Sequence, residues 1–81
     1  MTQRVFTVVV EASGSGEERR YAVWLLTGSA DAASFTNRRA EAQQIFGPYR
    51  NKKAVEMTAE SVSRVLIQSG ALVERVTLDR S

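Results

Sequence analysis

The alternation of hydrophobic and polar positions predicts several strands in this chain. Residues 5–12 and 20–27 are rich in β-branched and aromatic residues that alternate between two faces, and residues 72–78 alternate in the same way. Such segments are typical of strands in a partly covered sheet. The polar stretch at residues 13–18 contains two glycines and predicts a loose antiparallel hairpin between the first two strands.

A long amphipathic helix is predicted between Asn51 and Gly70. Gly47-Pro48 is expected to stop the preceding segment, because proline has no amide hydrogen to donate. Asn51 is suited to the N-cap position, and Gly70 is suited to the left-handed position that ends many helices. Apolar and small residues recur at spacings of three and four and predict one buried stripe, made of Val55, Ala59, Val62, Val65, Leu66 and Ser69.

Residues 28–44 leave alternatives open. Ser29 or Asp31 could cap a short helix that runs through Phe35, and residues 38–43 could continue it or form a loop. Residues 44–46 are favoured as a short strand over one long, broken helix. The expected order is therefore β-β-(α)-β-α-β.

The predicted fold class is α+β, in a single domain over residues 1–81. We expect a small antiparallel or mixed sheet of three or four strands, with one long amphipathic helix packed on one face. The chain has 81 residues with 43% hydrophobic and 25% charged residues, which is ordinary for a globular domain.

Composition argues against most enzyme classes. The chain contains no cysteine and no histidine, which removes thiol chemistry, the commonest metal ligand and the commonest general base near neutral pH. Carboxylate pairs at residues 17–18 and at Glu56 and Glu60 are more simply explained as solvated surface groups. We expect no catalytic residue, cofactor or metal.

The N-terminal apolar run is short and alternating, and no segment approaches the length of a membrane span. It is interpreted as a strand rather than a signal peptide. The expected location is therefore cytoplasmic, with no membrane partner.

The second strand carries the first candidate interface. If the long helix covers the face of Tyr21, Val23 and Leu25, the opposite face presents Trp24 with Ala22 and Leu26. An exposed apolar face of this kind usually marks a protein partner or a homodimer interface. The alternative is that the segment at residues 29–35 folds over Trp24.

A basic set is the second candidate site. If the turn and the helix start bring them together, these residues would make a positive patch at a helix N-terminus, where phosphates bind, with an aromatic side chain able to stack on a base. The net charge of +2 is low for a dedicated nucleic-acid binder. The patch would consist of Arg38, Arg39, Arg50, Lys52, Lys53 and Tyr49.

The C-terminal half resembles the second half of a sporulation-related repeat (SPOR) domain. The matching positions are a Gly-Pro-aromatic turn, a small cap, an Ala-Glu helix and a closing glycine: Gly47, Pro48, Tyr49, Asn51, Ala54, Glu56 and Gly70. The resemblance covers about residues 43–79 and implies binding of peptidoglycan glycan strands. The overall layout also resembles short proteins of actinobacterial phages.

Together these features predict a small non-enzymatic binding module, one that engages a protein partner or a second copy of itself through a sheet face. Nucleic-acid or polyanion binding through the basic set is the alternative, and glycan binding of the SPOR kind is the second alternative.

Overall fold

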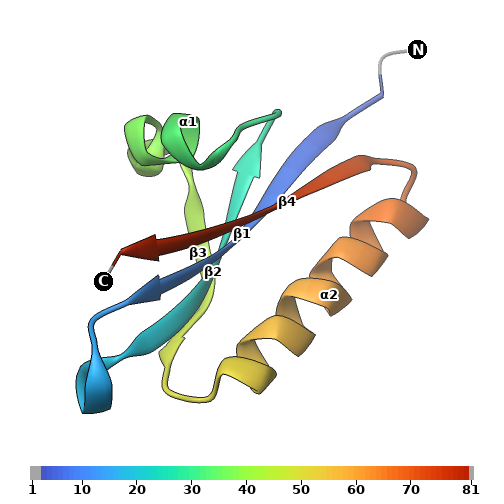
Figure 1. Ribbon diagram of the computed structural model, residues 1–81. Helices are drawn as coiled ribbons and strands as arrows, with labels where there is room; N and C mark the ends of the chain where they lie inside the picture. The colour runs from blue at the N-terminus through green and yellow to red at the C-terminus, as the bar shows by residue number, and fades with distance from the viewer. Residues whose placement is uncertain (1–2, 81) are drawn as a thin grey trace.

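The computed structural model describes residues 3–80 and confirms the predicted α+β class and element order (Figure 1). Two connecting segments each contain a short 3-10 turn. Gly16–Glu18 lies in the connection at residues 13–18, and Arg39–Glu41 lies in the connection at residues 38–42. The main elements are β1 (Val5–Ser13), β2 (Arg20–Thr27), α1 (Ala32–Asn37), β3 (Gln43–Tyr49), α2 (Lys52–Gln68) and β4 (Leu72–Arg80).

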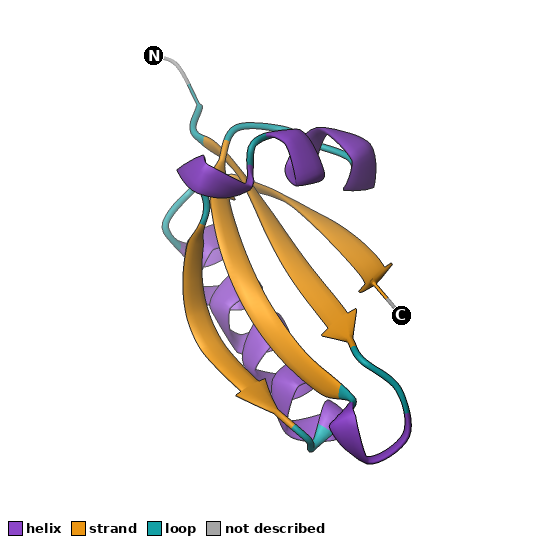
Figure 2. Ribbon diagram, turned by 90° about the vertical axis from the view of Figure 1, so that its left-hand side faces the viewer, coloured by secondary structure: helices purple, strands orange, loops and turns teal. Residues whose placement is uncertain are grey.

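The four strands form one mixed sheet in the order β3-β2-β1-β4. β1 and β2 make an antiparallel hairpin in which Val9 lies opposite Trp24, and β4 runs parallel to β1 with Val76 beside Val9. Because parallel strands need a crossover connection, α2 carries the chain from β3 at one edge to β4 at the other. The two helices cover opposite faces of the sheet (Figure 2).

α2 packs on the face that the alternation of β2 indicated. Val8, Val10 and Val23 of the sheet meet Val55 and Ala59 of the helix in a buried cluster. The predicted helix ends are also confirmed. The side chain of Asn51 accepts a hydrogen bond from the Ala54 amide at 3.1 Å, and Gly70 has a φ of 94°.

The predicted buried stripe of α2 is wrong at its C-terminal end. Val65 is 64% exposed and Ser69 is exposed, whereas Ser63 is buried. A buried serine is tolerated because its hydroxyl donates to the Ala59 carbonyl within the helix at 2.8 Å. The buried stripe is therefore turned toward Ser63, and Val65 faces away from the sheet.

The open alternatives between β2 and β3 are resolved by Asp31. Its carboxylate accepts a hydrogen bond from the Ser34 amide at 2.8 Å, so Asp31 and not Ser29 caps α1. The same hydrogen bond to the Ser34 backbone lowers the pKa of Asp31. α1 ends at Asn37, and a 3-10 turn rather than a continued helix leads into β3.

The prediction that Gly47-Pro48 ends the third strand is wrong, because β3 continues to Tyr49. The peptide bond between Gly47 and Pro48 is cis, and the pairing register with β2 shifts beside it. β3 lies at the edge of the sheet, where a proline costs no ladder hydrogen bond if its missing donor faces outward. β4 is also longer than expected and extends to Arg80.

Candidate functional site

Trp24 lies beneath the segment that connects β2 and β3. Its ring meets Phe35 of α1 edge-on, with ring centroids 6.0 Å apart, and the Arg39 guanidinium lies 4.9 Å from its centroid. The indole nitrogen donates to Glu11 Oε1 at 3.2 Å. The structure therefore shows the alternative in which the segment at residues 29–35 folds over Trp24.

Trp24 is half-buried, and the other two residues of the first candidate interface are buried. Ala22 is 6% and Leu26 is 1% exposed, and Leu26 belongs to a buried cluster with Val9 and Phe35. The expectation that Trp24, Ala22 and Leu26 form an exposed apolar face is wrong, because α1 and the following turn close over it.

A buried carboxylate holds α1 and the following turn on the sheet. Glu11 is 5% exposed and accepts hydrogen bonds from Arg39, one of them at 2.6 Å, while Arg80 of β4 approaches it to 3.6 Å. A carboxylate removed from water is tolerated when cations and N–H donors surround it in this way. Arg39 is thus engaged in holding the fold.

The basic set is divided between the two ends of β3. Arg38 and Arg39 precede the strand and pair with Glu41 and Glu11, respectively. The other group follows the strand at the start of α2, and Figure 1 shows the two groups at opposite ends of the sheet. The condition for one positive patch, that the turn and the helix start bring all the residues together, is not met.

The second basic group is partly engaged as well. Arg50 donates to the Glu17 carbonyl at 2.9 Å, and Lys52 Nζ lies 3.8 Å from a carboxylate oxygen of Glu56. Lys53 is exposed, and Tyr49 is 51% exposed with its ring against Phe46. These exposed pairs are weak, so the group keeps positive character without forming a built anion site.

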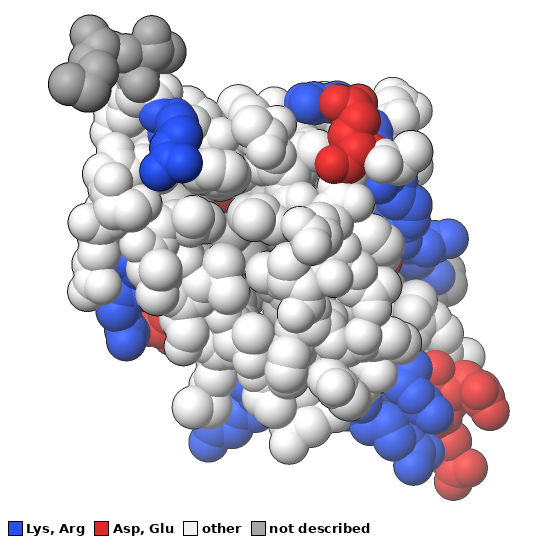
Figure 3. Space-filling view, turned by 180° about the vertical axis from the view of Figure 1, so that it is seen from behind, with Lys and Arg blue, Asp and Glu red and all other residues white. Residues whose placement is uncertain are grey.

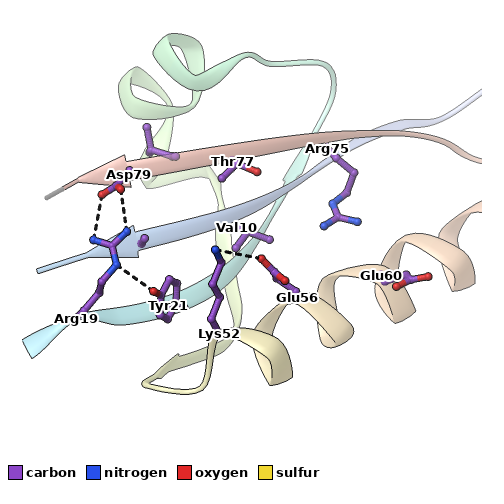
Figure 4. Close-up of a pocket in the computed structure, with 11 residues that line it drawn as sticks. Val10, Arg19, Tyr21, Lys52, Glu56, Glu60, Arg75, Thr77 and Asp79 are labelled. Carbon is purple, nitrogen blue, oxygen red and sulfur yellow. Dashed lines mark hydrogen bonds and ion pairs between the residues drawn. The ribbon is translucent and has the colours of Figure 1, made fainter. Parts of the chain in front are cut away.

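A cleft of about 400 Å³ opens between the first half of α2 and the strands β1 and β4 (Figure 4). Arg19 crosses one end of it, donating to Asp79 at 2.8 Å and to the Tyr21 hydroxyl at 3.0 Å. The hydrogen bond to Asp79, followed by that to Tyr21, raises the pKa of Arg19. Lys52 and Glu56 line the helix side of the cleft.

Charges in this cleft largely satisfy one another. Arg19 pairs with Asp79, Lys52 with Glu56, and Glu60 with Arg64 outside the cleft. Arg75 lines the cleft without an ion pair inside the described range 3–80. No group of three carboxylates placed to hold a metal ion occurs among those same residues. The cleft is therefore lined by paired charges together with apolar side chains such as Val10 and Leu78.

A second exposed surface, which the sequence reasoning missed, lies along the β3 edge and the adjacent side of α2. Three shallow hollows follow one another there, and Phe46, Ala54, Ser61 and Val62 connect them. Met57 is 59% and Val65 is 64% exposed. We call this surface the β3–α2 face and define it by Phe46, Tyr49, Ala54, Met57, Val62 and Val65.

The β3–α2 face carries little charge. No charged residue occurs from Ala42 to Tyr49. Viewed from this side, uncharged side chains fill the centre, and lysines, arginines and acidic residues lie toward its periphery (Figure 3). The sequence did hold a signal for it: Met57 and Val65 are apolar and eight residues apart, so they share a helix side that differs from the buried stripe.

The chain matches no known protein family, and neither curated proteins nor solved structures give a significant similarity. The SPOR resemblance therefore stays a prediction. Neither of the helices among residues 3–80 has the length and apolar character needed to cross a membrane.

Proposed function

We propose that this protein is a non-enzymatic binding module that engages another protein chain through the β3–α2 face. The observation that supports the proposal most directly is the exposure of large apolar side chains beside an uncharged edge strand. Tyr49, Met57 and Val65 are each more than half exposed. Contiguous apolar surface of this kind, rimmed by polar residues, is characteristic of protein interaction sites.

The arrangement also supplies two kinds of contact at once. β3 pairs with β2 on one side and, within residues 3–80, with no strand on the other. An edge strand can hydrogen-bond an added strand, and neighbouring side chains then provide specificity. α2 places its second apolar side next to that edge, so one partner could contact both elements.

Capture from native host lysate with immobilised protein tests this function when face variants are compared. Val65→Glu and Met57→Glu each put a charge on the β3–α2 face, and Ile67→Glu is the matched control. Ile67 is 58% exposed on the same helix but lines none of the three hollows of the β3–α2 face.

A specific protein that survives nuclease treatment, is lost with both face variants and is kept with the control is the expected result. Capture that disappears with nuclease would instead favour the polyanion alternative. Retention on denuded peptidoglycan, unaffected by the face variants, would favour the glycan alternative.

A further inference from the structure

The two edges of the sheet differ in charge. β4 carries Glu74, Arg75, Asp79 and Arg80 within nine residues, whereas β3 carries no charged residue. Charged side chains on an edge strand discourage pairing with another chain, and an edge without them remains open to it. β3 is therefore the edge at which this sheet can be extended.

We infer that the occupant of the β3–α2 face is a second copy of this chain, joined by antiparallel pairing of β3 with β3 across a two-fold axis. The inference rests on the proposed function, because it names the partner of the same face. A two-fold axis perpendicular to the sheet makes neighbouring edge strands antiparallel and continues the sheet from four strands to eight.

This symmetry also fixes the relation of the two α2 helices. Both helices lie on the same side of the extended sheet and run in opposite directions. The Val65 end of each helix then lies toward the Met57 end of the other, and the helix sides that adjoin β3 face each other across the axis. Pro48 lacks an amide hydrogen, which confines the new pairing to Gln43–Phe46.

Charge favours a second copy over a charged partner. In a two-fold dimer the same surface of both copies meets, so a face with a net charge would repel itself. The β3–α2 face avoids this cost because its charges lie at the periphery (Figure 3). A strongly acidic or basic partner would find no opposite charge at the centre of the face.

The area predicts a weak dimer. A helix of 17 residues is about 25 Å long. One helix packed on one sheet layer presents a height of roughly 20 Å, since packed layers lie about 10 Å apart. Each copy thus contributes roughly 500 Å², and the total of roughly 1,000 Å² is at the lower limit for a specific interface. We expect a reversible, concentration-dependent equilibrium.

Sedimentation equilibrium of the full chain from about 10 μM to about 1 mM tests this assignment. The dimer dissociation constant is expected to rise at least about tenfold in Val65→Glu and in Met57→Glu and to change less than about twofold in Ile67→Glu. The double variant Met57→Glu/Val65→Lys tests the helix direction, because antiparallel helices would place opposite charges near each other and restore part of the affinity.

The outcomes separate the partner from the function. A monomer throughout this range would overturn self-association, while capture of another protein by the same face would leave the proposed function standing. A dimer insensitive to Val65→Glu and Met57→Glu would overturn the assignment of the second copy to the β3–α2 face, and lysate capture that both variants leave unchanged would overturn the proposed function. A double variant no better than the single variants would overturn the antiparallel arrangement. Circular dichroism of each variant confirms that it is folded.

Discussion

Two glycines with nearly equal backbone angles have different roles. Gly47 and Gly70 have φ values of 92° and 94°. A Cβ atom on Gly47 would lie 2.6 Å from the Tyr21 carbonyl oxygen, whereas one on Gly70 would meet nothing within 4 Å. Gly70 is thus required by its left-handed conformation alone, and Gly47 also by the close approach of β3 to β2.

Alanine substitutions should separate these two requirements. Gly70→Ala is expected to lower the free energy of unfolding by about 1–2 kcal/mol, the cost of a left-handed conformation. Gly47→Ala should lower it by about 1–3 kcal/mol more, because the methyl group overlaps backbone atoms of β2. Urea denaturation followed by circular dichroism measures both values, and equal losses would contradict the close-contact role of Gly47.

Local sequence signals sufficed for one of these residues and not for the other. The C-terminal position of Gly70 follows from helix-ending chemistry, which involves neighbours in the chain. Gly47 was predicted as part of a terminator, since Gly-Pro usually interrupts regular structure. Its contact with β2 depends on the pairing of strands whose residues lie 26 positions apart in the chain. A pattern of neighbouring residues cannot predict such a contact.

At the level of elements, the short α1 segment and its following turn are held on the sheet by the ion pair between Arg39 and Glu11. The Glu11 side chain is 6% exposed and the Arg39 side chain 29% exposed, whereas both partners of the neighbouring Arg38–Glu41 pair are more open to water. Removing a cation from a buried carboxylate is costly, and breaking an exposed pair is not.

Arg39→Met should therefore lower the free energy of unfolding by about 3 kcal/mol, because Glu11 would keep only the more distant Arg80 as a cation. Arg38→Met is the matched control and should cost less than about 1 kcal/mol. Chemical denaturation of both variants gives the comparison. If Arg39→Met lowers the free energy of unfolding as little as the control does, the Arg39–Glu11 pair does not hold α1 and the following turn on the sheet.

Most elements could be predicted from periodicity, including the hairpin, α2 and the last strand. The covering of Trp24 could not be decided, because it depends on whether a six-residue helix packs on the sheet or projects from it. The ion pair of Arg39 with Glu11 joins residues 28 positions apart, so Arg39 was assigned to a basic patch instead. Val65 was predicted to be buried because it follows Val62 at a spacing of three. The same spacing also fits the adjacent side of the helix, where Val65 lies.

On the scale of the whole molecule, the sheet has one charged edge and one uncharged edge. The uncharged edge at β3 adjoins an exposed apolar side of α2, and the proposal of protein contact at the β3–α2 face rests on this combination. The sequence predicted a binding module with an apolar sheet face but placed that face at Trp24. The error arose because face assignment by alternation shows which side chains share a surface, not which surface another segment covers.

Nuclear magnetic resonance spectra of the ¹⁵N-labelled chain at about 20 μM and about 1 mM give the most direct test. If two copies associate through the β3–α2 face, amide shifts will change with concentration at Gln43–Phe46 and along the exposed side of α2 near Met57 and Val65. Amides of β4 and α1 will stay fixed. Spectra that do not change, or changes confined to β4 or α1, would contradict association through this face.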